Sequence, residues 1–194
     1  MKGKIGRHLF HLVGGCIPPI VGLVLPREWT LVFFGTVAAI FVAIEILRLT
    51  IVSVNRWLMS LFSGVSAGFK PREVARPIGT TFYLVASFLT FLFFSRDVAV
   101  AALFFAAVGD AMAAAVGEQY GRTKVGMKSL EGSGAFFASA LVVGFILVLA
   151  GLHLNWLAVT VGAAVAALVE LLPIPIDDNL TVPIISAVVM TLLL

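Results

Sequence analysis

Apolar segments separated by short polar turns run along the whole chain. They cover residues 10–25, 29–47, 78–94, 98–120, 135–152, 156–172 and 180–194. An α-helix needs roughly 20 apolar residues to cross the hydrocarbon core of a bilayer, and most of these segments approach that length. The last segment is short for a crossing. The pattern therefore predicts about seven transmembrane helices.

Residues 51–69 show a different pattern, in which apolar side chains recur at helical spacing against polar ones. A helix with one apolar and one polar face suits the membrane interface better than a crossing. We therefore expect an amphipathic helix that lies in the interface. Its apolar positions are Ile51, Val54, Leu58, Leu61 and Val65.

The composition agrees with a membrane protein. Of the 194 residues, 61% are hydrophobic and 12% are charged, whereas soluble domains are about 25% charged. We expect a single all-α domain, residues 1–194, built as a polytopic helical bundle. The only cysteine, Cys16, excludes a disulfide within the chain.

The basic residues predict an orientation in the membrane. If the N-terminus is cytoplasmic, 11 of the 13 Lys and Arg residues lie on the inner side, and only Arg27 and Arg96 lie outside. The C-terminus is then outside. We expect the protein in the cell membrane or, in a eukaryote, in the endoplasmic reticulum. Most acidic residues fall on the same inner side, so we expect the active site there. This charge distribution fits membrane orientation and favours no nucleic-acid partner.

Asp110 lies inside an apolar segment, where a charge is costly and is usually functional. Gly109, Ala113, Gly117 and Gly121 recur every fourth residue beside it. Small residues at this spacing let another helix approach closely, either within the chain or in a homodimer. We expect Asp110 to point into the bundle as a metal ligand or as a group that orients a reacting hydroxyl. A structural carboxylate paired with Arg or Ser is the alternative.

A glycine-rich loop at residues 121–131 carries Arg122, Lys124 and Lys128. Cations and exposed backbone N–H groups both bind phosphate oxygens. Gly132-Ser133 is expected to open the next helix, whose N-terminus favours an anion. The loop approaches a Walker A sequence, but its spacing is wrong and a helix precedes it. It predicts a nucleoside triphosphate with its metal, or else an ordinary basic loop at lipid head groups.

Asp177-Asp178-Asn179 begins the last apolar segment. Asp and Asn commonly cap helices, which is the simplest explanation. Two carboxylates and an amide exceed what a cap needs, and oxygen ligands of this kind suit Mg²⁺. We therefore predict these three residues, with Asp110, as a magnesium site.

Glu45 and Arg48 stand three residues apart, on one face of a helix. They form either an interfacial ion pair or part of the site, with Arg48 on a phosphate and Glu45 positioning the acceptor. Arg72, Glu73 and Arg76, in the charged loop that follows, are further candidates, although loop charges are commonly only solvated.

Together these stretches resemble the CTP-dependent lipid-alcohol kinases, which include dolichol kinase, phytol kinase and the yeast-type CTP-dependent diacylglycerol kinase. The resemblance runs through nearly the whole chain. Its motifs are Gly109-Asp110 with Gly117 and Gly121, Lys128-Ser129-Leu-Glu131-Gly132-Ser133, Asp177-Asp178-Asn179-Leu-Thr181-Val-Pro183, Glu45-x-x-Arg48, Arg72-Glu73 with Gly79-Thr80, and Arg7-x-x-x-His11-x-x-Gly14.

The resemblance implies transfer of the γ-phosphate of CTP to the hydroxyl of a membrane lipid alcohol, such as a polyprenol, phytol or geranylgeraniol. It also implies that residues 109–133 hold the nucleotide. The catalytic candidates are Asp110, Glu45 and Lys128, and either Asp110 or Glu45 accepts the proton. The nucleotide- and phosphate-binding candidates are Gly109, Gly117, Gly121, Arg122, Lys124, Lys128, Ser129, Glu131, Gly132, Ser133, Arg48 and Arg76; those for Mg²⁺ are Asp110, Asp177, Asp178 and Asn179.

Two other functions stay open at this point. A CDP-lipid synthase would also use CTP, Mg²⁺ and a lipid at the same membrane face. A small ion-coupled transporter would use intramembrane acids as an ion path. Its acids should be spread across the membrane depth, whereas the acids here cluster on one side.

Overall fold

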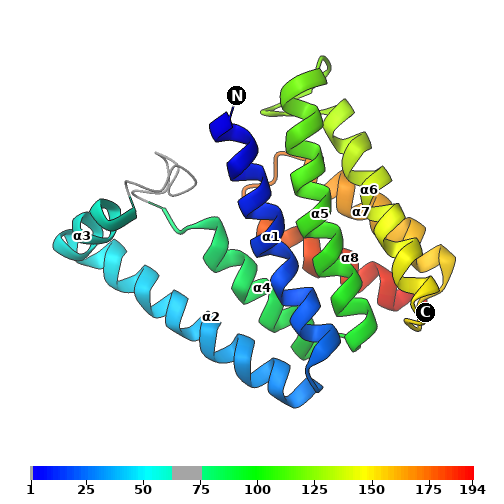
Figure 1. Cartoon of the computed structure of the whole chain (residues 1–194), viewed down its shortest axis with the longest axis horizontal. Coiled ribbons are helices and arrows are strands. Elements are labelled where there is room, and N and C mark those ends of the chain that lie inside the picture. Colours follow the sequence, from blue (N-terminus) through cyan, green and yellow to red (C-terminus); the bar gives the residue numbers. More distant parts are fainter. Residues whose placement is uncertain (1, 63–75) are drawn as a thin grey trace.

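The computed structural model describes residues 2–62 and 76–194, and this part of the chain is all-α apart from one small hairpin (Figure 1). The predicted fold class is confirmed. The elements are α1 (Lys2–Val24), α2 (Arg27–Thr50), α3 (Val52–Phe62), α4 (Gly79–Phe93), α5 (Arg96–Tyr120), β1 (Lys124–Val125), β2 (Lys128–Ser129), α6 (Leu130–Leu149), α7 (Trp156–Leu171) and α8 (Asp178–Leu192).

Among the described helices, α2, α5 and α6 are long and apolar enough to cross a membrane. The other apolar helices, including α4, α7 and α8, are shorter, so a total of seven crossings stays a prediction. Large apolar side chains remain exposed on the outer helix faces, for example those of Val32, Phe33 and Leu149. Such extensive apolar surface suits contact with lipid, and the protein is a membrane protein.

Helix α5 forms the centre of the bundle. It packs against α1, α6, α7 and α8, and 67% of its apolar stretch is buried. Residues 98–103 of this helix are almost fully buried. Helices α2 and α3 extend to one side of the bundle, where α2 packs against α4 (Figure 1). Asp110 is therefore carried by the helix at the centre of the bundle.

Helices α5 and α6 pack closely through the small residues that the sequence pattern singled out. A Cβ atom at Gly109 would lie 2.5 Å from the ring of Phe136 on α6. A Cβ atom at Gly132 would lie 2.8 Å from the carbonyl oxygen of Ala113 and 3.3 Å from Cα of Gly117. The predicted close approach along this face is confirmed, and its partner is a helix of the same chain.

The polar connection between α5 and α6 contains more regular structure than predicted. β1 and β2 pair antiparallel, and Gly126 in their turn has φ +62°, which favours glycine. Gly132-Ser133 was expected to open helix α6, but the helix begins earlier, at Leu130. The Ser129 side chain caps it by accepting a hydrogen bond from the Gly132 N–H at 3.1 Å.

The predicted interfacial helix corresponds to α3, and its expected continuation lies outside the described residues. The structure describes helix α3 as far as Phe62. The continuation to residue 69 and the candidates Arg72 and Glu73 fall among the undescribed residues 63–75. The structure therefore describes the first part of the amphipathic segment, packed against α2.

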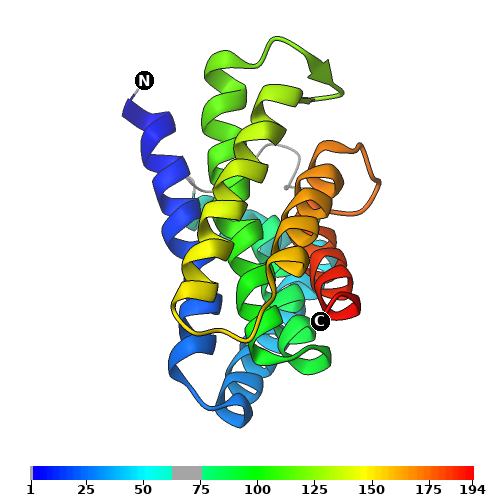
Figure 2. The ribbon, with the colours of Figure 1, turned by 90° about the vertical axis from the view of Figure 1, so that its right-hand side faces the viewer.

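Polar connections gather at two ends of the bundle (Figure 2). The N-terminus, the hairpin and the α7–α8 connection lie toward one end, and the α1–α2 turn and the α6–α7 connection lie toward the other. At the second end, the Arg27 side chain donates to the Leu92 carbonyl at 3.1 Å, and Arg96 Nε donates to the Gly22 carbonyl at 2.7 Å. Both carbonyls lie in the last turn of a helix, where backbone acceptors lack helical partners. These two arginines, which the sequence set apart from the other cations, therefore tie helix ends together.

The close approach of α5 and α6 predicts opposite changes in stability when two glycines are each replaced by alanine. Gly109→Ala should lower the stability by about 1–3 kcal/mol, because the new methyl group would collide with the fully buried Phe136 ring. Gly134→Ala is the matched control on α6, since nothing lies within 4 Å of its added Cβ. It should raise the stability by roughly 0.5–1 kcal/mol. Thermal unfolding in one detergent measures both, and equal shifts in the two variants would contradict the described packing.

Candidate active site

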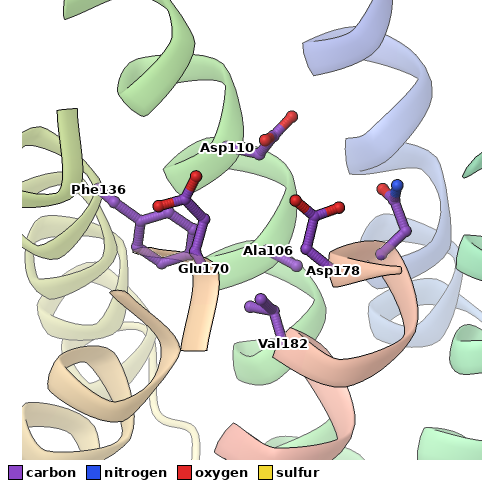
Figure 3. Close-up of a pocket in the computed structure, with 7 residues that line it drawn as sticks. Ala106, Asp110, Phe136, Glu170, Asp178 and Val182 are labelled. Atoms are coloured by element: carbon purple, nitrogen blue, oxygen red, sulfur yellow. The ribbon is translucent and has the colours of Figure 1, made fainter. Parts of the chain in front are cut away.

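Three carboxylates from three helices meet at one place in the bundle (Figure 3). Asp110 comes from the middle of α5, Glu170 from the last turn of α7 and Asp178 from the first turn of α8. One carboxylate oxygen of each lies within 4.8 Å of those of the other two. The sequence predicted Asp110 and Asp178 as ligands of one metal, and the structure brings them together.

The three carboxylates line a small open pocket whose remaining wall is mostly apolar. Ala106, Phe136 and Val182 line it, together with Asn179. Glu170 is 5% exposed, whereas Asp110 is exposed and Asp178 is half-buried. The pocket is therefore accessible from the Asp110 side and closed behind Glu170.

Lys128 completes the site from the hairpin. Its Nζ lies 2.8 Å from Asp178 Oδ2 and 3.0 Å from Glu170 Oε1, and it also donates to the backbone carbonyl of Glu170. Burial alone would lower the pKa of Lys128, but the carboxylates of Asp178 and Glu170 outweigh burial and raise it. The side chain is therefore a cation throughout the neutral pH range. Lys128 thus contributes one positive charge beside three carboxyl groups.

The chemistry of the donor set fits a magnesium ion. Mg²⁺ prefers oxygen ligands at roughly 2 Å, so ligands on opposite sides of the ion stand about 4 Å apart. Carboxylate oxygens that lie within 4.8 Å of one another are compatible with that spacing. Asp110, Glu170 and Asp178 are the described residues that would hold the ion.

Asp177 and Asn179 have a different local role from Asp178. Asp177 Oδ1 accepts a hydrogen bond from the Asn179 backbone N–H at 3.1 Å and another from Asn179 Nδ2 at 2.8 Å. Asp177 is thus the N-cap of α8. The capping explanation that the sequence left open applies to Asp177, and Asp178 is the member of the pair that joins the carboxylate cluster.

The predicted phosphate-binding residues of the hairpin divide into two groups. Arg122 and Lys124 are exposed and are not part of the carboxylate cluster. Lys128, on the same hairpin, forms an ion pair with Asp178. Ser129 is 3% exposed and caps α6, so its hydroxyl already serves the local fold. Gly121 packs against it, since an added Cβ would lie 2.6 Å from Ser129 Oγ.

Four further residues of the predicted nucleotide-binding segment also make local contacts. The Glu131 carboxylate accepts from the Thr123 N–H at 3.0 Å and holds the start of the hairpin. The Ser133 hydroxyl donates to the Ala167 carbonyl at 3.0 Å and links α6 to α7. Gly117 and Gly132 face each other in the α5–α6 contact. Nucleotide binding by this segment stays a prediction, because these contacts account for the described positions of the side chains.

Glu45 and Arg48 lie in a separate buried network. Arg48 is 1% exposed and Glu45 is 6% exposed, and Arg48 Nε donates to Glu45 Oε2 at 2.9 Å. Arg76 is exposed, and its backbone carbonyl accepts from Arg48 Nη2 at 2.5 Å. Among the residues that the structure describes, the lining of the pocket does not include these three.

Glu170 is the one cluster member to which the sequence analysis assigned no role. A signal was present, because Glu170 is a carboxylate near the end of the apolar segment 156–172. The rule that singled out Asp110 applies to it as well. Its partners come from α5, α8 and the hairpin, so only the packing of the helices shows that it belongs to the site.

Comparisons with known proteins find lipid kinases among the relatives of this chain. The chain is 30% identical over 151 residues to the CTP-dependent diacylglycerol kinase 1 of Saccharomyces cerevisiae, with 65% of this chain and 52% of the relative covered. It is 33% identical over 149 residues to the probable chloroplastic phytol kinase 1 of Glycine max, with 66% and 47% covered.

A second pair of relatives covers more of the chain at lower identity. The probable chloroplastic phytol kinase of Zea mays is 27% identical, with 100% of this chain and 68% of the relative covered. An uncharacterized protein of Rickettsia prowazekii is 23% identical, with 92% and 88% covered. No protein-family model and no solved structure matches the chain.

The fold and the site define an integral membrane protein with a polar, carboxylate-lined pocket in its helical bundle. Within that class, the chain is similar to a CTP-dependent diacylglycerol kinase and to probable phytol kinases, and this similarity supports the CTP-dependent lipid kinase family. The chain spans about half the length of the yeast and soybean relatives.

The contacts of Lys128 predict an unusual response to its removal. Lys128→Met should tighten binding of Mn²⁺, used as a magnesium probe without nucleotide, by on the order of tenfold, because the ammonium no longer competes for Glu170 and Asp178. Lys124→Met, on the neighbouring strand, is the control and should leave this affinity nearly unchanged. Electron paramagnetic resonance of free Mn²⁺ measures it. Weaker binding in Lys128→Met would contradict the competition.

Proposed function

We propose that this protein transfers the γ-phosphate of CTP to the hydroxyl of a membrane lipid alcohol, with Mg²⁺ as cofactor. The observation that carries the proposal is the meeting of Asp110, Glu170 and Asp178 with Lys128 beside a basic hairpin. The names of the yeast, soybean and maize relatives support a kinase that acts on a lipid alcohol. CTP as the donor rests on the family alone.

Phosphoryl transfer depends mainly on positioning the reactants and neutralising charge, which this site is suited to do. Bound Mg²⁺ would neutralise phosphate charge, and Asp110, Glu170 and Asp178 would hold it. Lys128 supplies a permanent cation next to that ion. Arg122 and Lys124, exposed on the same hairpin, supply further positive charge for phosphate oxygens.

The apolar wall of the pocket suits a lipid alcohol as the acceptor. Ala106, Phe136 and Val182 lie on this wall, next to the carboxylates, and such a wall suits the carbon atoms beside an alcohol hydroxyl. Asp110 lines the pocket and is exposed. Of the two proton acceptors considered, we therefore assign the role to Asp110 rather than to Glu45.

We place the site on the cytoplasmic side, with the N-terminus also cytoplasmic. The N-terminus and the basic hairpin lie toward one end of the bundle, and the α1–α2 turn lies toward the other (Figure 2). Arg27 begins α2 directly after this turn, and Arg96 donates to the Gly22 carbonyl just before it. Basic segments prefer the cytoplasmic side, where CTP is available. Reporter fusions at the two termini would test this topology.

Labelled CTP separates the proposed kinase from a CDP-lipid synthase. A kinase moves label from γ-labelled CTP into lipid and none from α-labelled CTP, whereas a synthase does the reverse. With a panel of lipid alcohols and mass spectrometry of the products, we expect γ-label transfer to at least one alcohol. Asp110→Asn should reduce the rate by on the order of 100-fold.

The two labels also allow a decisive negative result. Lipid labelled only from the α-position would replace the kinase with a synthase. Ion flux into liposomes in the absence of nucleotide would instead support the transporter. Normal turnover in Asp110→Asn would remove this residue from the mechanism.

Asp177 and Asp178 should respond differently to the same substitution. Asn caps a helix as well as Asp does, so Asp177→Asn should keep the rate within about threefold of the wild type. Asp178→Asn removes a carboxylate from the cluster and the ion pair with Lys128, so it should lose on the order of 100-fold. Initial rates at saturating CTP measure both. Equal losses would mean that Asp177 also serves the metal.

A further inference from the structure

A buried network ties the end of α2 to the segment that begins α4. Glu45 Oε2 accepts from Arg48 Nε at 2.9 Å, and Arg48 Nη2 donates to the Arg76 carbonyl at 2.5 Å. Glu45 Oε1 accepts from the Ile78 N–H at 3.1 Å and from the Thr81 hydroxyl at 3.2 Å. Both oxygens of this carboxylate are therefore engaged by the fold.

These contacts make Glu45 the cap of a helix to which it does not belong. The N-cap residue of α4 is Ile78, whose own side chain makes no capping hydrogen bond. The first N–H groups of a helix lack helical partners and carry partial positive charge, so they favour a nearby carboxylate. Glu45, on α2, supplies that carboxylate and fixes where α4 begins.

The start of α4 in turn contacts the start of α8. A Cβ atom at Gly79 would lie 2.9 Å from Nδ2 of Asn179, so the two segments are in close contact. The same Nδ2 donates to Asp177, the N-cap of α8. Asp178, the next residue, is a member of the carboxylate cluster. A continuous set of contacts thus runs from Glu45 to the metal-site candidate.

We propose that Glu45 and Arg48 are positioning residues that hold Asp178 in the carboxylate cluster through the starts of α4 and α8. The proposal rests on the proposed metal-dependent function, and it assigns the pair no contact with nucleotide or lipid. Disturbing the pair should displace Asp178 and weaken metal binding, while the chemistry at saturating metal proceeds nearly normally.

Glu45→Gln separates positioning from proton transfer. A carboxamide oxygen can still accept hydrogen bonds from Ile78 and Thr81, but it cannot take up a proton at neutral pH. Because Gln keeps the cap, the variant that tests positioning is Glu45→Met combined with Arg48→Met. It removes the cap and both charges together, so that Arg48 is not left buried without its partner charge. We expect the double variant to need about tenfold more Mg²⁺ for half-maximal rate, with kcat at saturating Mg²⁺ within about threefold of the wild type.

Two variants outside the pair keep the proposal testable if the double variant fails to fold. Gly79→Ala pushes directly on Asn179, and Thr81→Val removes one donor to Glu45. Both should weaken binding of Mn²⁺, measured without nucleotide, by about three- to tenfold. Thr90→Val is the matched control on α4, since the Thr90 hydroxyl donates to the Ala86 carbonyl of its own helix. It should leave Mn²⁺ binding unchanged.

The results have distinct meanings. Unchanged Mn²⁺ affinity in both Gly79→Ala and Thr81→Val would overturn the proposal. A double variant that binds Mn²⁺ normally but has lost kcat at every Mg²⁺ concentration would show that the pair acts in the chemistry, and would overturn it as well. Failure of the proposed function would appear differently, as a wild-type protein that binds Mn²⁺ but transfers no phosphate, and the Mn²⁺ comparison among variants would still test the positioning role.

Discussion

The contact of the Lys128 ammonium with Glu170 and Asp178 is the interaction on which the site depends. Carboxylates are costly at membrane depth, and bringing three together adds mutual repulsion. Lys128 offsets part of this cost at 2.8 and 3.0 Å from two of them. It reaches them because the chain reverses at Gly126, whose positive φ suits the tight turn of the hairpin. The hairpin therefore contributes to the site by placing this positive charge beside the carboxylates.

The position of that hairpin follows from the packing of α5 against α6. Gly117 and Gly121 leave room for Ser129 and Gly132, so β2 begins close to the end of α5. A larger residue on this face would move β2, and Lys128 with it, away from Asp178. The glycines of this segment thus have a packing role whether or not they also approach a phosphate, which explains why a Walker-like composition occurs without the Walker fold.

Much of the site was predictable because its residue types stand out in the sequence: a charge inside an apolar segment, a basic glycine-rich loop and paired carboxylates before a helix. Asp110, Lys128 and Asp178 were all proposed from the sequence, and they meet in the structure. Glu170 was not assigned, since its role depends on how α7 ends beside α8. Asp177 and Asp178 are adjacent and chemically alike, so only side-chain direction separates the cap from the cluster. Strands of two residues have no hydrophobic period by which a hairpin could be predicted.

Glu45 shows that a buried carboxylate in such a protein need not belong to its chemistry. Its oxygens already accept from Arg48, Ile78 and Thr81. To bind a metal or take a proton it would have to give up bonds that hold the start of α4, and a buried Arg48 would lose its counter-charge. Asp110 stands in the opposite situation, exposed in a pocket beside two other carboxylates. The two carboxylates are therefore accommodated differently in one bundle. Glu45 is buried and held by hydrogen bonds that fix the scaffold, whereas Asp110 is exposed in the pocket where we propose that a cation binds.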